Sequence, residues 1–145
     1  MALKQNDNSN FRKRVLDYSQ CDVLALTETF LKGGEKLNIA GYEFFGHNRI
    51  NLHRNAKRGS AGIGILVKNA ILQSYNVHIL DIEFEGIMWI KFQPKIHDSD
   101  TIIVAVCYLP PNESSRAIDA EFYFQNLLQQ VYNYQNLGKI VICGI

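Results

Sequence analysis

The sequence predicts a mixed α/β fold of α+β character, in which helices cover layered β-sheets. Two near-continuous apolar runs, at 22–27 and 139–143, have the composition of strands buried on both faces. Between them lie shorter apolar segments bounded by glycine, proline and asparagine, and one longer segment with helical spacing. The resulting order of one helix, several strands, a long helix and a last strand indicates alternating layers around a hydrophobic core.

A short helix is expected over 11–18. Residues 8–10 (Asn-Ser-Asn) are residue types that cap helices well, so we expect the helix to begin after them. Phe11, Val15 and Tyr18 then fall along one face.

Seven strands are expected along the rest of the chain. They lie at 22–27, 42–45, 61–67, 75–82, 86–93, 101–108 and 139–143. The polar and basic stretch 46–60 separates the second from the third and is expected to form a long loop. The glycines in the third strand allow close approach of a neighbouring backbone.

The long helix is expected between the sixth and seventh strands. Ser115 can serve as its N-terminal cap, and Gly138 is placed to end it. The apolar residues at helical spacing within it are Phe124, Leu127, Leu128, Val131 and Tyr134.

Length and composition limit the classes of protein to which this chain can belong. At 145 residues and 47% hydrophobic content, the chain has the length of one domain with a substantial core. We expect no membrane span, because no apolar run is long enough, and no secretion, because the N-terminus has no hydrophobic signal region. The odd, widely spaced Cys21, Cys107 and Cys143 indicate free thiols, so an intracellular location, nuclear or cytoplasmic, is expected.

Charge is distributed unevenly although its net value is only +1. No acid occurs from Phe44 to Leu80, whereas eight occur from Asp81 to Glu121. The acid-free segment contains the basic residues Arg49, Arg54, Lys57, Arg58 and Lys68. Such a segment could meet a polyanion, and an ordinary solvated loop is an equally good explanation of the charge alone.

Four short stretches of the sequence are the best indication of its function. Residues 22–29 end in Thr-Glu-Thr, 58–67 form a glycine-rich strand, 108–112 read Tyr-Leu-Pro-Pro-Asn, and 139–144 end in Gly. In this order they resemble the endonuclease/exonuclease/phosphatase superfamily, most closely the endonuclease domains of non-LTR (LINE-type) retrotransposons. The resemblance implies a four-layer αββα sandwich, of which this chain holds a part, and a divalent-metal-dependent phosphodiesterase acting on DNA.

The resemblance also assigns roles to individual residues. It implies that Glu28 binds Mg²⁺ or Mn²⁺, that the Tyr108 hydroxyl contacts the phosphate, and that Asn112 contacts phosphate after the prolines. A carboxylate suits these hard cations, and a phenol can donate to developing negative charge. Without the motifs, the better interpretation of Glu28 is a strand-end surface acid, and the better interpretation of Tyr108 is a core aromatic at a strand end. The residues expected to bind nucleic acid are Arg49, Arg54, Lys57 and Arg58.

Several family motifs are missing from the sequence. Gly144 is followed by Ile145, not by the Asp-x-Asn that continues the family's motif, and no Ser-Asp-His follows. The family's first strand is also not evident before the helix at 11–18. We therefore expect one domain, residues 1–145, that is C-terminally truncated and lacks its first strand, with exposed strand edges.

Three functions remain open from the sequence. The first is a DNA-nicking endonuclease fragment, inactive as it stands because it lacks the general base. The second is a non-catalytic remnant that binds nucleic acid weakly through the basic loop. The third is a phosphatase of the same fold. The expected partners are DNA and either the missing C-terminal half or a reverse transcriptase domain of the parent protein.

Overall fold

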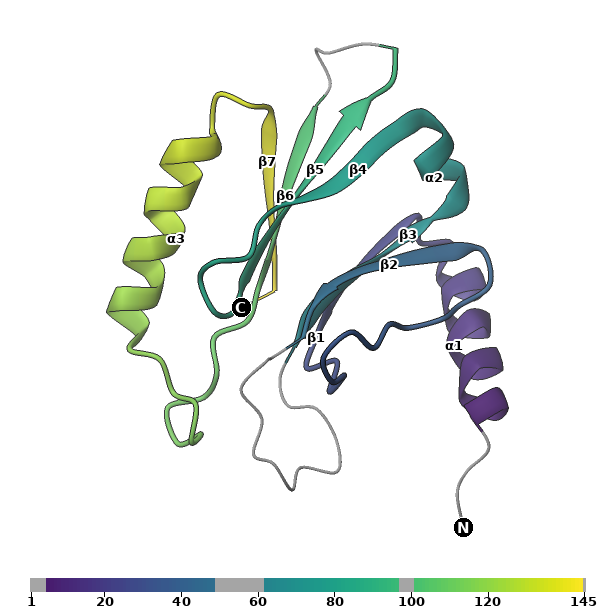
Figure 1. The fold of residues 1–145 in the computed structure, drawn as a ribbon, viewed down its shortest axis with the longest axis horizontal. Helices are drawn as coiled ribbons and strands as arrows, with labels where there is room; N and C mark the ends of the chain where they lie inside the picture. The colour runs from purple at the N-terminus through teal and green to yellow at the C-terminus, as the bar shows by residue number, and fades with distance from the viewer. Residues whose placement is uncertain (1–4, 49–61, 97–100, 145) are drawn as a thin grey trace.

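The computed structural model describes residues 5–48, 62–96 and 101–144, with side chains described from Asn10 onward. These residues form four layers: helix α1 (Gln5–Ser19), a three-stranded sheet, a four-stranded sheet and helix α3 (Ala120–Tyr134) (Figure 1). The αββα order confirms the α+β sandwich expected from the sequence. None of the described helices is long and apolar enough to cross a membrane.

The first sheet has the strand order β1-β3-β2 and is antiparallel throughout. Its strands are β1 (Val23–Thr27), β2 (Tyr42–His47) and β3 (Ile63–Lys68). The central strand β3 alternates its apolar side chains, so that Leu66 packs toward Leu16 of α1 and Ile65 packs toward the other sheet. Gly64 is required in β3 because a Cβ there would lie 2.4 Å from the ring of Phe44.

The second sheet has the order β4-β5-β6-β7. Its strands are β4 (Tyr75–Asp81), β5 (Ile87–Pro94), β6 (Ile102–Cys107) and β7 (Lys139–Gly144). The first three are consecutive antiparallel neighbours, whereas β7 pairs parallel to β6 after the crossover through α3. The short helix α2 (Asn69–Ser74), which the sequence analysis did not predict, connects the two sheets.

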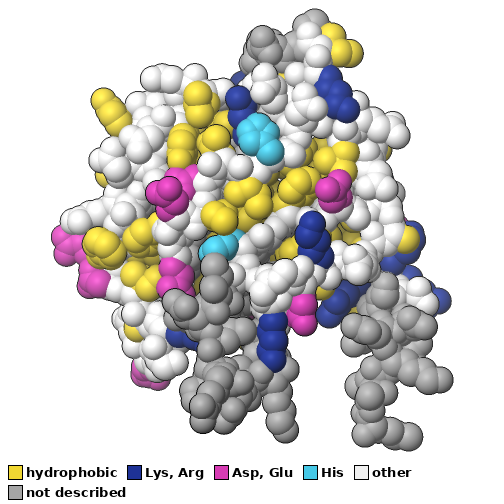
Figure 2. All heavy atoms as spheres, viewed as in Figure 1, with side chains coloured by type: hydrophobic (Ala, Val, Ile, Leu, Met, Phe, Trp, Pro, Cys, Tyr) yellow, Lys and Arg dark blue, Asp and Glu magenta, His cyan; other side chains and the backbone are white. Residues whose placement is uncertain are grey.

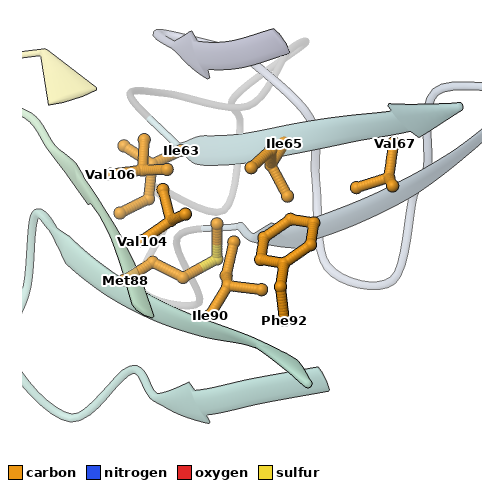
Figure 3. Close-up of a cluster of buried hydrophobic side chains, with 8 residues drawn as sticks. All are labelled: Ile63, Ile65, Val67, Met88, Ile90, Phe92, Val104 and Val106. Atoms are coloured by element: carbon orange, nitrogen blue, oxygen red, sulfur yellow. The ribbon is translucent and has the colours of Figure 1, made fainter. Parts of the chain in front are cut away.

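Buried side chains fill the space between the two sheets (Figure 3). They project from β3 on one side and from β5 and β6 on the other: Ile63, Ile65, Val67, Met88, Ile90, Phe92, Val104 and Val106. Alternate residues of β5 and β6 face the other way, where Trp89 and Ala105 pack against Tyr123 and Leu127 of α3. Each fully buried side chain of this size contributes about 1.5–3 kcal/mol of transfer free energy, which holds the layers together.

The helix boundaries differ from those expected. Helix α1 already includes Gln5, so residues 8–10 lie inside it and do not cap it. Asn and Ser cost only about 0.5–0.7 kcal/mol each in a helix interior, which a packed helix tolerates. Among its described side chains Leu16 is buried, whereas Phe11, Val15 and Tyr18 are exposed.

Helix α3 also begins and ends elsewhere than predicted. Its N-cap is Asp119, whose carboxylate accepts a 2.8 Å hydrogen bond from the Phe122 backbone N–H, and not Ser115. The helix ends at Tyr134, and Gly138 instead precedes β7. Tyr123 and Leu127 are buried, but Phe124 and Leu128, which the periodicity grouped with the core, are exposed.

The two strands predicted to be buried on both faces are only partly covered. Within the described residues, β1 and β7 each have a strand neighbour on one side only. Residues 23–26 of β1 are half-buried, and Val141 and Ile142 of β7 are each 45% exposed. Because β1 packs across from β6 and β7, the two edges lie on the same side of the sandwich.

Candidate active site

Glu28 lies directly after β1, where the chain turns sharply. Both Glu28 and Phe30 adopt left-handed backbone conformations, with φ values of 53° and 54°. For residues other than glycine this costs roughly 1–2 kcal/mol each, so the surrounding contacts must hold the turn. The turn takes the Glu28 carboxylate out of the strand direction and places it at the end of the first sheet.

Tyr108 follows β6 in the second sheet and is fixed through its backbone. Its N–H donates a 2.8 Å hydrogen bond to the carbonyl of Gly86, which also accepts a 3.0 Å bond from the Tyr123 hydroxyl. Gly86 has φ of +87°, and a Cβ there would lie 2.4 Å from the Tyr108 carbonyl oxygen. The segment between β4 and β5 therefore needs glycine at this point to let Tyr108 sit where it does.

The structure brings Tyr108 and Glu28 together. The Tyr108 hydroxyl donates a 2.6 Å hydrogen bond to Oε1 of Glu28, so the ends of β1 and β6 meet across the two sheets. The Glu28 carboxylate, followed by partial burial, raises the pKa of Tyr108 above its ordinary value, while the charge of Arg116 acts in the opposite direction. Tyr108 is thus a protonated donor at neutral pH, held against an acid.

Buried polar groups support the turn that carries Glu28. The Asn48 amide nitrogen donates to the carbonyls of Gly33 and Glu35, at 2.7 and 2.8 Å, and Asn48 is 9% exposed. The Thr29 N–H donates a 3.2 Å bond to the Gly62 carbonyl. Asn48 Oδ1 and Thr29 Oγ1 are buried without a hydrogen-bond partner among the described residues. The loop after β1 is therefore tied to the end of β2 and the start of β3.

Sequence reasoning did not identify Asn48. It lies in a polar stretch expected to be a solvated loop, and an amide that holds two carbonyls looks the same in sequence as one that faces water. The structure extends β2 through His47 and buries Asn48 immediately after it. No signal in the single sequence distinguishes this asparagine from its polar neighbours.

The predicted nucleic-acid-binding residues Arg49, Arg54, Lys57 and Arg58 lie outside the described residues. The described residues that flank this segment in the sequence are Asn48 and Gly62. Both of these points contact the loop after β1, through the hydrogen bonds of Asn48 to Gly33 and Glu35 and of Thr29 to Gly62. Asn48 and Gly62, the described residues on either side of this segment, therefore lie close to the turn that holds Glu28.

Asn112, the third predicted site residue, is not joined to the pair. It is exposed in the turn that follows Pro111, and it makes no hydrogen bond with another described residue. The turn is closed by the Ser114 N–H, which donates to the Pro111 carbonyl at 2.9 Å. The structure thus places Asn112 in the loop after Tyr108, without a hydrogen bond to Glu28.

The donor set fits a cation that keeps much of its own hydration. In the part of the chain that the structure describes, no three His, Cys, Asp or Glu side chains gather where they could hold a metal ion. Mg²⁺ is commonly bound through one or two carboxylates, with waters and substrate phosphates completing its shell. The single Glu28 carboxylate suits that mode of binding and does not form a closed protein cage.

Charged side chains are scattered over the face viewed in Figure 2, and the cavity beside Glu28 is largely apolar. The face viewed in Figure 2 shows hydrophobic, acidic, basic and histidine side chains intermixed among the described residues. A cavity of about 390 Å³ lies between α1 and the first sheet, and Glu28 and Thr29 line it together with mostly apolar residues such as Leu26 and Phe30. This mostly apolar lining, which also includes Arg12, offers few polar groups to a ligand.

Comparison with known proteins identifies the family. No curated protein matches the chain. The family model described as Endonuclease/Exonuclease/phosphatase family matches residues 3–144, which include every described strand and helix. That family has the fold of metal-dependent phosphodiesterases, is generally dependent on divalent metal, and generally acts on nucleic acids. From its αββα layers and this match over nearly its whole length, the chain belongs to the endonuclease/exonuclease/phosphatase family.

Proposed function

We propose that this chain is the metal- and phosphate-binding part of a DNA-nicking endonuclease of the retrotransposon type, and that its 145 residues bind DNA without cutting it. The observation that carries the proposal is the 2.6 Å hydrogen bond between Tyr108 and Glu28. It joins two of the three residues to which the family resemblance assigns a role, although 80 positions separate them in the sequence. The Thr-Glu-Thr and Tyr-Leu-Pro-Pro stretches favour the retrotransposon branch and therefore DNA as substrate.

Each residue of the site has a distinct role in this proposal. Glu28 holds Mg²⁺ or Mn²⁺, and the bound cation supplies positive charge to the scissile phosphate. Tyr108 is protonated at neutral pH, and in this role its single O–H leaves the Glu28 carboxylate and donates to a phosphate oxygen instead. Asn112 contacts phosphate from the following turn, and the basic residues Arg49, Arg54, Lys57 and Arg58 position the DNA backbone.

The proposed lack of cleavage concerns these 145 residues taken alone, because they contain no proton acceptor of the kind that the family uses. The sequence lacks the Asp-x-Asn continuation and the Ser-Asp-His motif that supply the family's base and its orienting acid. General base catalysis typically accelerates a reaction by about 10²–10⁴-fold. An enzyme that loses several residues of one catalytic site retains mainly the ability to bind its substrate. A partner segment, either a complementing C-terminal half or a reverse transcriptase domain, would complete the enzyme.

Manganese binding tests the metal site without requiring activity. Electron paramagnetic resonance of Mn²⁺ titrated into the protein should show binding that Glu28→Gln weakens by at least about tenfold. The matched control Glu43→Gln makes the same charge change at an exposed position of β2 and should leave binding unchanged. Equal Mn²⁺ affinity in the wild type and Glu28→Gln would refute the metal site.

DNA and lipid-type substrates separate the remaining functions. Anisotropy of a labelled duplex should show binding that falls steeply with salt, and supercoiled plasmid with Mg²⁺ should remain intact. If DNA binding is indifferent to Mn²⁺ and to Glu28→Gln, the non-catalytic remnant is the better explanation. Release of phosphate from inositol phosphates would favour the phosphatase, and plasmid nicking by the 145 residues would contradict the proposed inactivity.

A further inference from the structure

Arg116 is isolated among acidic residues in the loop between β6 and α3. It is the only lysine or arginine between Lys95 and Lys139, and Glu113 and Asp119 lie three positions to either side of it. In the part of the chain that the structure describes, its guanidinium group makes no ion pair or hydrogen bond with these acids or with another residue. The Asp119 carboxylate is instead engaged as the N-cap of α3. The nearest acids in the sequence therefore do not account for this cation.

The loop that carries Arg116 is compact, and both of its ends are fixed beside Tyr108. Leu109 and Ile118 pack against the same buried cluster, which includes Tyr123. The Tyr123 hydroxyl and the Tyr108 N–H donate to one and the same carbonyl, so this cluster borders Tyr108. Arg116 is two residues from Ile118, a backbone distance of at most about 7 Å. The loop lies at the same end of the sandwich as the turn after β1 (Figure 1).

Hydrogen bonds inside this loop hold the backbone of Arg116. Its N–H donates to Ser114 Oγ at 3.2 Å, and the Ala117 N–H donates to the Ser114 carbonyl at 3.0 Å. The Ser114 N–H in turn donates to the Pro111 carbonyl at 2.9 Å. The Arg116 side chain is half-buried. Because its backbone is already ordered, this arginine loses less entropy on binding a ligand than an arginine at a free loop tip.

The charge of Arg116 acts on the candidate site. It favours the phenolate form of Tyr108, and so opposes the rise in the Tyr108 pKa that Glu28 causes. Arg116 forms no ion pair with Glu28, whose Oε1 is occupied by the Tyr108 hydroxyl at 2.6 Å. A partly buried charge without a partner is unfavourable until an anion joins it. The described part of the site thus includes a positive charge that its own carboxylate does not neutralise.

We propose that Arg116 binds a phosphate of the DNA backbone beside the phosphate oxygen that Tyr108 contacts. The inference rests on the proposed function, because it takes the DNA held at Glu28 and Tyr108 as its ligand. A guanidinium group remains charged at physiological pH and can donate two parallel hydrogen bonds to one phosphate. Tyr108 and Asn112 supply no positive charge, and Glu28 repels the phosphate, so Arg116 offsets that repulsion as DNA approaches.

The salt dependence of DNA binding tests this contact on the full chain. Each phosphate contact adds about 0.9 to the magnitude of the slope of log K against log salt concentration. With a labelled duplex and anisotropy as the readout, Arg116→Gln should reduce the slope by about 0.9 and weaken binding by about fivefold or more. Arg116→Lys should keep the slope and lose only part of the affinity, because an ammonium group cannot bind two oxygens in parallel.

Lys139→Gln is the matched control. It removes one positive charge from an exposed position at the opposite end of the second sheet, where Lys139 pairs with Ile102 at the start of β6. The slope and the affinity of this variant should equal those of the wild type. If Arg116→Gln loses its circular dichroism signal, Arg116→Met takes its place with the same expected slope, because methionine keeps the apolar stem of the side chain.

Mn²⁺ binding separates the failure of this inference from the failure of the proposed function. Arg116→Gln should bind Mn²⁺ at least as tightly as the wild type, because it removes a positive charge and no ion pair of Glu28. A salt slope equal to that of the wild type, or a loss of Mn²⁺ binding in this variant, would overturn the inference alone. A wild type that does not bind the duplex, or binds it without dependence on salt, would overturn the proposed function and this inference with it.

Discussion

The hydroxyl of Tyr108 donates a 2.6 Å hydrogen bond to Oε1 of Glu28, from the end of a strand in one sheet to the end of a strand in the other. The bond links the two sheets at the end where the candidate site lies. It also makes the two residues electrostatically dependent on each other, since the carboxylate is the largest cause of the raised pKa of Tyr108.

Neutralising Glu28 should therefore change the titration of Tyr108. With Glu28→Gln the pKa of Tyr108 should fall toward its ordinary value, because the negative acceptor that disfavours the phenolate is gone. The absorbance change near 295 nm measures this titration, and Tyr108→Phe identifies which component belongs to Tyr108. Glu43→Gln should leave the titration unchanged. An identical phenol titration in the wild type and Glu28→Gln would contradict the hydrogen bond.

Gly86→Ala should destabilise the protein and displace Tyr108. The new Cβ would meet the Tyr108 carbonyl oxygen at 2.4 Å, and φ of +87° is itself unfavourable for alanine. Strain of this kind costs about 1–3 kcal/mol of unfolding free energy. Urea unfolding measures the loss, and weakened Mn²⁺ binding would report the displacement of the site. Gly34→Ala is the control, because no atom lies within 4 Å of its added Cβ. Equal stability of the two variants would contradict this account.

Asn48→Asp should be more damaging than most surface substitutions. It replaces the amide that donates to the Gly33 and Glu35 carbonyls with a carboxylate that repels both oxygens at a buried position. The expected loss is about 2–4 kcal/mol of unfolding free energy, because a buried charge is left unpaired. Asn112→Asp makes the same change at an exposed turn and should cost less than about 0.5 kcal/mol. Thermal unfolding of both variants measures these losses, and an equal loss in the two variants would contradict the buried role of Asn48.

Stability should fall in alkaline solution partly because of Tyr134. Burial, followed by its hydrogen bond to Asp81, raises the pKa of Tyr134 to about 12. An unfolded tyrosine titrates near 10, so the folded state resists deprotonation: its contribution is complete below pH ~10 and is lost as the pH rises toward 12. Urea unfolding between pH 8 and 11.5 should show this decline. Tyr134→Phe should flatten the decline without abolishing it, because burial also raises the pKa of Tyr123. A slope unaffected by Tyr134→Phe would refute the assignment.

The strands could be predicted from the sequence because alternation and turn residues are local signals. The segments expected at 75–82, 86–93 and 101–108 appear as β4, β5 and β6 with boundaries shifted by no more than one residue. Helix ends were harder to place. A lone Asn or Ser can cap a helix or lie within it, and the choice of Asp119 over Ser115 depends on where α3 must pack.

The candidate site was only partly accessible to sequence reasoning. Glu28 and Tyr108 could be selected from their motifs, but their hydrogen bond depends on the stacking of two sheets, which no local pattern encodes. The buried role of Asn48 depends on where the loop after β1 passes, which is likewise a property of the tertiary structure. That the pair binds metal and phosphate, and that Asn112 takes part, are predictions, of which the Mn²⁺ titration tests the metal site.

The consecutive antiparallel order of β4, β5 and β6 has a consequence for how the chain folds. These strands pair with their immediate neighbours in sequence, so their contacts close short loops and form early. Strand β1 must instead pair with β3 across an intervening strand, and Glu28 must find Tyr108 over 80 positions. We expect the second sheet to serve as the folding nucleus and the carboxylate–phenol pair to assemble last, so that a partly folded chain already has its core but not its site.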